Sequence, residues 1–87
     1  MAKYRKKPVV IEAFQVPSPN GDVMVPLWFL SALFNKTVEA DPAGGVVVKT
    51  LEGDMRGDVG DWIILGVAGE IYPCKPDIFA ATYEAVE

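Results

Sequence analysis

The longest uninterrupted apolar run in the second half of the chain is centred on Trp62–Leu65, where no polar residue separates the side chains. Because alternation is missing, this run predicts a strand that is covered on both faces. The glycines in 66–69 permit a chain reversal. Glu70–Tyr72 then alternates again, and Pro73 is expected to end the pairing. The hairpin Gly60–Pro73 is therefore predicted to form the centre of the core.

Four further segments have strand character or are extended. The β-branched run Val46–Leu51 is typical of a strand, and 8–16 carries apolar residues on both faces. The alternation in 83–86 predicts a closing edge strand, whereas 54–57 favours a short strand or an extended connection. Turn-forming residues predict loops at 17–22 and 36–45.

The segment at about 26–35 is the best helix candidate, because Pro26 suits the first turn of a helix. At 100° per residue, five apolar side chains share an arc of about 160°: Leu27, Phe29, Leu30, Leu33 and Phe34. Trp28 falls on the polar side with Ser31 and Asn35. That position favours either a terminal segment folded over the indole or a surface for a partner or a second copy. We therefore take Trp28, Ser31 and Asn35 as candidate partner-binding residues.

The element order predicts an α+β fold. We expect one domain over 1–87, with a small, mostly antiparallel curved sheet or partly closed barrel of four to six strands. One helix is expected at about 26–35 and a short helical turn near 77–82, where Asp77 complements the helix dipole. Hydrophobic residues make up 51% of this short chain, which favours a homo-oligomer about as strongly as a monomer.

The charges are unevenly distributed, although the net charge is −4. A basic leader at 1–7 holds Lys3, Arg5, Lys6 and Lys7, and the rest of the chain has four basic and twelve acidic residues. The acidic balance argues against nonspecific binding of nucleic acid or membrane. The leader is predicted to be a solvated flank that protects a strand edge. The alternative is an arm that contacts phosphates.

The chain has no histidine and a single cysteine, Cys74. This composition excludes Ser–His and Cys–His nucleophile pairs, and zinc sites that need histidine or several cysteines. One cysteine forms no intramolecular disulfide, which favours a reducing, cytosolic compartment. No run is long enough for a membrane span, and no secretory signal is visible. We therefore expect a soluble protein without catalytic residues or a cofactor.

Four carboxylates crowd a glycine-rich stretch: Glu52, Asp54, Asp58 and Asp61. Carboxylates on loops can bind Ca²⁺ or Mg²⁺, but their spacing does not match a known calcium loop. Since turns also require Asp and Gly, solvated turn carboxylates are favoured over a cation site.

Two blocks carry a family resemblance: KYRKKPVVIEAFQ at 3–15, and TLEGDM, GDWIILGVAGE and YPCKPDIFAATYE between 50 and 84. Together they resemble a family of uncharacterised small proteins of tailed bacteriophages and prophages. The resemblance implies a phage origin and the host cytoplasm, and it supplies no catalytic residue. We expect a non-enzymatic accessory protein that binds a host or phage protein. The alternatives are a nucleic-acid-associated protein that uses the basic leader, a small carboxylate-dependent hydrolase, and a minor virion component.

Overall fold

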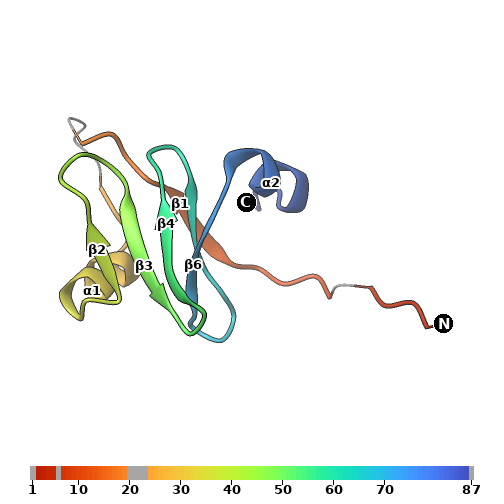
Figure 1. Cartoon of the computed structure of the whole chain (residues 1–87). Coiled ribbons are helices and arrows are strands. Elements are labelled where there is room, and N and C mark those ends of the chain that lie inside the picture. Colours follow the sequence, from red (N-terminus) through yellow and green to blue (C-terminus); the bar gives the residue numbers. More distant parts are fainter. Residues whose placement is uncertain (1, 6, 20–23, 87) are drawn as a thin grey trace.

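The computed structural model describes residues 2–5, 7–19 and 24–86, and this part of the chain holds six strands and two helices (Figure 1). Their order is β1 (Glu12–Gln15), α1 (Leu27–Phe34), β2 (Val38–Ala40), β3 (Val46–Thr50), β4 (Gly53–Gly57), β5 (Trp62–Leu65), β6 (Ile71–Cys74) and α2 (Pro76–Thr82). All strand pairs are antiparallel. The predicted α+β class is confirmed. The strands form two three-stranded sheets, β1-β5-β6 and β2-β3-β4, which do not close into a barrel.

β5 is the central strand of its sheet, with β1 on one side and β6 on the other. Ile63 and Ile64 are both 0% exposed. Because neighbouring side chains in a strand point to opposite faces, their joint burial means that both faces of β5 are covered. The predicted doubly covered strand is therefore confirmed. Pro73 does not end the pairing but lies within β6 opposite Ile63, which is tolerated because β6 is an edge strand.

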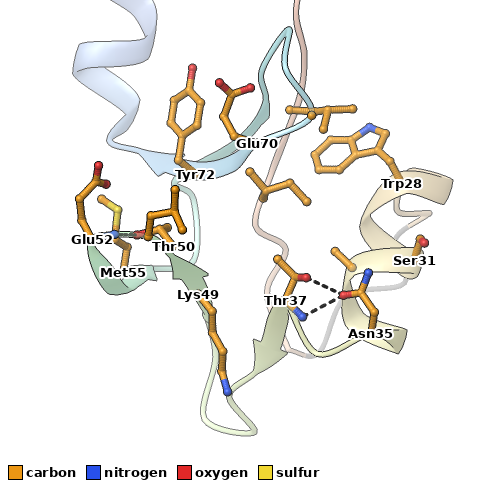
Figure 2. Close-up of a pocket in the computed structure, with 15 residues that line it drawn as sticks. Trp28, Ser31, Asn35, Thr37, Lys49, Thr50, Glu52, Met55, Glu70 and Tyr72 are labelled. Carbon is orange, nitrogen blue, oxygen red and sulfur yellow. Dashed lines mark hydrogen bonds between the residues drawn. The ribbon is translucent and has the colours of Figure 1, made fainter.

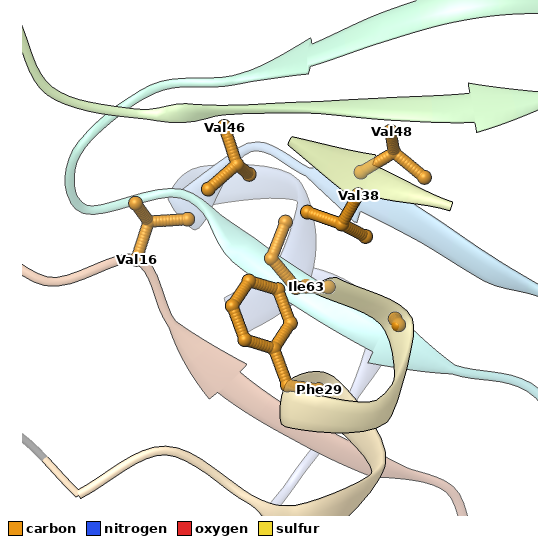
Figure 3. Packing of buried hydrophobic residues seen from close by; sticks show 7 residues of the cluster. Val16, Phe29, Val38, Val46, Val48 and Ile63 are labelled. Carbon is orange, nitrogen blue, oxygen red and sulfur yellow. The ribbon is translucent and has the colours of Figure 1, made fainter. Parts of the chain in front are cut away.

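The main core lies between the two sheets and is closed at one end by α1 (Figure 3). Seven buried residues form it: Val16, Phe29, Ala32, Val38, Val46, Val48 and Ile63. They come from both sheets and the helix. Burial of each large apolar side chain contributes about 1.5–3 kcal/mol, so this cluster joins the three elements into one unit.

α2 covers the other face of the β1-β5-β6 sheet. The ring of Phe79 stacks on Trp62 with centroids 4.1 Å apart and an interplanar angle of 7°. The predicted helical turn is confirmed, with Pro76 at its start and Asp77 in its first turn. The predicted strand at 83–86 is wrong, because the Tyr83 N–H bonds to the Phe79 carbonyl at 2.9 Å and keeps the chain beside the helix.

The predicted helix is present, but its buried face was assigned wrongly. Phe29 and Ala32 are buried, whereas Leu27 and Phe34 are 81% and 91% exposed. At 100° per residue the true inner face is rotated by about 110° from the predicted apolar arc. The reason is that apolar residues occur all around α1, so that no single face stands out in the sequence.

Two strand boundaries also differ from prediction. β2 lies inside the predicted loop at 36–45, where Val38 is buried opposite Val48. Three residues are too few to show a strand pattern in sequence. β1 begins at Glu12 instead of residue 8, because its partner β5 ends at Leu65, directly opposite Glu12.

In the described part of the chain, neither helix has the length and apolar character needed to cross a lipid bilayer.

Candidate binding groove

A groove of about 860 Å³ opens between α1, the β3–β4 turn and the β5–β6 hairpin (Figure 2). Its fifteen lining residues are Trp28, Ser31, Ala32, Asn35, Thr37, Lys49, Thr50, Leu51, Glu52, Met55, Leu65, Gly69, Glu70, Ile71 and Tyr72. The three helix residues that the sequence suggested for partner binding thus share one wall. Whether they contact a partner stays a prediction, but their common location makes this groove the first candidate site.

Trp28 forms the apolar end of that wall, on the side of α1 that it shares with Ser31 and Asn35, and it is half-buried. Its ring packs edge-on against Phe14 and Phe29, with centroids 5.7 and 6.1 Å away. β1 therefore supplies the N-terminal cover that was one of the two alternatives for this residue. The indole Nε1 is buried and has no hydrogen-bond partner among the described residues.

Asn35 fixes the polar end of the same wall, where α1 ends. Its Oδ1 accepts hydrogen bonds from the Thr37 backbone N–H at 3.0 Å and from the Thr37 hydroxyl at 2.6 Å. The intervening Lys36 adopts a positive φ of 67°, a conformation that is uncommon outside glycine. These bonds direct the chain into β2 and hold the amide of Asn35 at the rim.

Two charged residues of the rim, Lys49 and Glu70, have partners within the fold. Lys49 pairs with Glu39 at 3.0 Å. This contact lowers the pKa of Glu39 and raises the pKa of Lys49. Glu70 accepts a hydrogen bond from the Ala68 N–H at 3.1 Å and so closes the β5–β6 turn. The groove consequently presents mainly apolar surface with polar groups at its edges, which suits a side chain or peptide segment.

The hydroxyl of Tyr72 lies 3.4 Å from that of Tyr83. This hydrogen bond, together with burial, raises the pKa of Tyr72 to about 12. Tyr72 therefore stays protonated at neutral pH and links the groove to the chain that follows α2.

The four carboxylates noted in the sequence do not converge. Asp58 and Asp61 share Lys75, at 3.1 and 2.8 Å, and Asp58 also pairs with Arg56 at 2.8 Å. Arg56 reaches further to Asp41 at 2.9 Å. Glu52 and Asp54 lie apart from this group in the β3–β4 hairpin.

This network joins the β2–β3 turn, β4 and the start of α2. Its paired bases lower the pKa of Asp58, and a backbone N–H with Arg56 lowers that of Asp41. Asp61 is buried and also accepts the Asp58 backbone N–H at 2.9 Å. Among residues 2–5, 7–19 and 24–86, no three His, Cys, Asp or Glu side chains are grouped as a metal site would require. Of the four carboxylates that the sequence singled out, Asp58 and Asp61 therefore act as structural ion pairs.

The remaining sequence candidates lie outside the groove. Lys3, Arg5 and Lys7 are exposed ahead of β1, and Lys6 is outside the described residues. Cys74 is half-buried at the end of β6, and burial raises the pKa of its thiol. A thiol with a raised pKa is a poor nucleophile at neutral pH.

Sequence reasoning missed the far wall of the groove, formed by Thr50, Met55 and Ile71. These residues belong to three strands, and only the packing of the two sheets brings them to one place. Searches against protein-family models, curated protein sequences and solved structures found no match to the chain.

Proposed function

We propose that this chain is a non-enzymatic accessory protein of a bacteriophage or prophage that binds a host or phage protein in the host cytoplasm. The contact surface is the outer side of α1 together with the adjoining groove. The observation that carries the proposal is the exposure of Leu27, Leu30 and Phe34 on one side of α1. We call these three residues the α1 stripe.

The spacing of the α1 stripe is that of a helical docking face. Residues at i, i+3 and i+7 lie above one another on a helix, so the three side chains form one continuous apolar strip. Ser31 and Asn35 follow on the side that faces the groove. A partner segment lying along α1 would thus cover the stripe and reach the groove at the same time.

Exposed apolar side chains cost solubility, and contiguous patches mark interaction sites more often than single residues do. Leu27 and Phe34 stay almost fully exposed, whereas the same chain buries seven other residues in its main core. A host or phage protein that binds here needs an apolar segment that can lie along α1 and in the adjoining groove. Such an interface derives its affinity from a few buried apolar anchors.

The experiment compares two aspartate substitutions at exposed apolar positions. Phe34→Asp changes the α1 stripe, and Ile78→Asp is the control in α2, where Ile78 is 55% exposed and lies outside the groove. Tagged chains are recovered from infected bacteria, and a protein that co-purifies in stoichiometric amount is then produced alone for direct binding measurements. We expect Phe34→Asp to weaken this binding at least about tenfold, as loss of one interface anchor does, and Ile78→Asp to leave it unchanged. Equal effects of both changes, or catalytic turnover by the purified chain, would contradict the proposal.

A further inference from the structure

Residues 7–11 extend β1 as an arm that runs clear of the folded body (Figure 1). Val9 and Val10 are 48% and 74% exposed on this arm. Within the described chain, no backbone hydrogen bond attaches residues 7–11 to the rest of the fold. The radius of gyration is 13.9 Å, compared with about 12 Å for a compact chain of this length. An extended apolar segment thus lies largely in solvent and, among the described residues, has no backbone hydrogen bonds to hold it.

The arm continues a strand whose outer edge is open. β1 is an edge strand of the β1-β5-β6 sheet, and the Val16 N–H donates to the Asp61 carbonyl on the β5 side at 2.8 Å. Backbone groups of successive strand residues point in alternate directions. Even-numbered positions therefore face the β5 side, and the odd-numbered positions 7, 9, 11 and 13 face outward. Pro8 lies in the even set, so its missing N–H leaves the outer edge intact.

The charges favour a second copy as the occupant of this edge. The first seven residues hold four bases and no acid, whereas the rest of the chain has twelve acids and four bases. Glu12 and Glu84 lie beside the arm, and neither forms an ion pair with another described residue. A basic arm from one copy is therefore attracted to the acidic body of another, beginning at these two carboxylates.

We propose that residues 7–13 pair antiparallel with the same residues of a second copy, around a two-fold axis at Val10. The pairing joins two β1-β5-β6 sheets into one continuous sheet of six strands. In this register position 7 pairs with position 13, and position 9 with position 11, through their outward backbone groups. Val10 faces the Val10 of the second copy across the axis, so the interface is self-complementary as a two-fold dimer requires.

The pairing also removes the exposed apolar surface described above. Val9, Val10 and Ile11 line a groove of about 310 Å³ with Phe79 and Val86, and the second copy extends the wall of this groove across the axis. An open, apolar strand edge otherwise invites disordered association. This surface uses other residues than the α1 stripe, so a dimer would leave the proposed partner site unoccupied.

The test is symmetric disulfide formation in the full chain, with Cys74→Ser as background. In Val10→Cys the two new thiols face each other as a directly opposed pair, with the close Cβ atoms that a disulfide requires. Val9→Cys is the matched control, because position 9 opposes position 11 and the two introduced cysteines are offset along the strands. Both positions are exposed and make no backbone bonds in the fold. We expect cross-linking through position 10 to be about tenfold faster than through position 9.

A second measurement does not depend on cysteine chemistry. In sedimentation, the unmodified chain should reach twice the mass of one chain as its concentration rises. Val10→Lys should hold it monomeric, because two charges would meet at the axis, whereas Val67→Lys in the β5–β6 turn should leave the dimer intact. A monomer at millimolar concentration, a dimer insensitive to Val10→Lys, or cross-linking at position 9 that equals that at position 10 overturns the proposal. So does a monomer that binds duplex DNA through residues 2–7.

Discussion

The orientation of α1 can be tested by replacing two aromatic residues that lie about 120° apart around the helix. Trp28 packs inward against Phe14 and Phe29, and Phe34 is 91% exposed. The sequence pattern places Phe34 on the buried arc and leaves Trp28 either covered by a terminal segment or exposed for a partner. Trp28→Ala and Phe34→Ala therefore separate the observed packing from the pattern-based one.

The expected loss for Trp28→Ala follows from its contacts. Truncation of a fully buried Trp costs about 3–5 kcal/mol, and the two edge-on aromatic contacts belong to the class worth about 0.5–1.5 kcal/mol each. Trp28 is half-buried, which reduces the burial contribution. The substitution also removes the buried, unpaired Nε1, and this offsets the loss of stability by about 1 kcal/mol. We expect a net loss of about 2–3 kcal/mol in the free energy of unfolding.

Phe34→Ala should change stability by less than about 0.5 kcal/mol, as exposed substitutions usually do, and the better helix propensity of Ala acts in its favour. Urea unfolding followed by circular dichroism measures both variants. With an m-value of about 1 kcal/mol/M, Trp28→Ala lowers the midpoint by about 2–3 M. An equal or larger loss in Phe34→Ala, or no loss in Trp28→Ala, would refute the inward orientation of Trp28.

Three further results are expected. Ile64→Ala should cost about 2–4 kcal/mol in urea unfolding, because Ile64 is fully buried in the central strand β5. A loss near zero would show that the hairpin is not part of the core. Gly45→Ala should lower the melting temperature in calorimetry more than Gly69→Ala does. Both residues have a φ of 86°, which strains an alanine equally. Only the methyl group at position 45 would also lie against backbone, 2.8 Å from the Gly57 carbonyl oxygen. The pKa values of Asp41 and Asp58 are lowered in the fold. The ion pairs of these two carboxylates therefore stabilise the fold fully above the unfolded pKa of about 3.9, and this stabilisation is lost as the pH falls through the lower folded pKa values. The melting temperature of a variant with both residues changed to Asn should depend less on pH in this range.

Part of the candidate site could be found from the sequence, because strong local signals mark it. Trp28, Ser31 and Asn35 were selected as one side of a helix, and one side of a helix stays together when the helix packs. The opposite wall could not be found in this way. Thr50 and Ile71 are 21 positions apart in the sequence and come together only because the two sheets pack face to face.

The sequence by itself determined the elements with strong patterns: the β5–β6 hairpin, β3, α1 and α2. Runs without polar residues, β-branched clusters and a proline at a helix start act locally, so they need no knowledge of the partner. It also determined the absence of histidine and the segregation of basic residues into the first seven positions.

The tertiary structure decided the rest. α1 is apolar on most of its circumference, so only its packing against Phe14 of β1 and the core between the two sheets selects which side is buried. β2 is too short to be recognised and exists because β3 offers an edge to pair with. Asp58 and Asp61 of the glycine-rich stretch became an ion-paired group because Lys75, from the start of α2, comes within 3.1 Å of both. Long-range contacts, not local pattern, set these features.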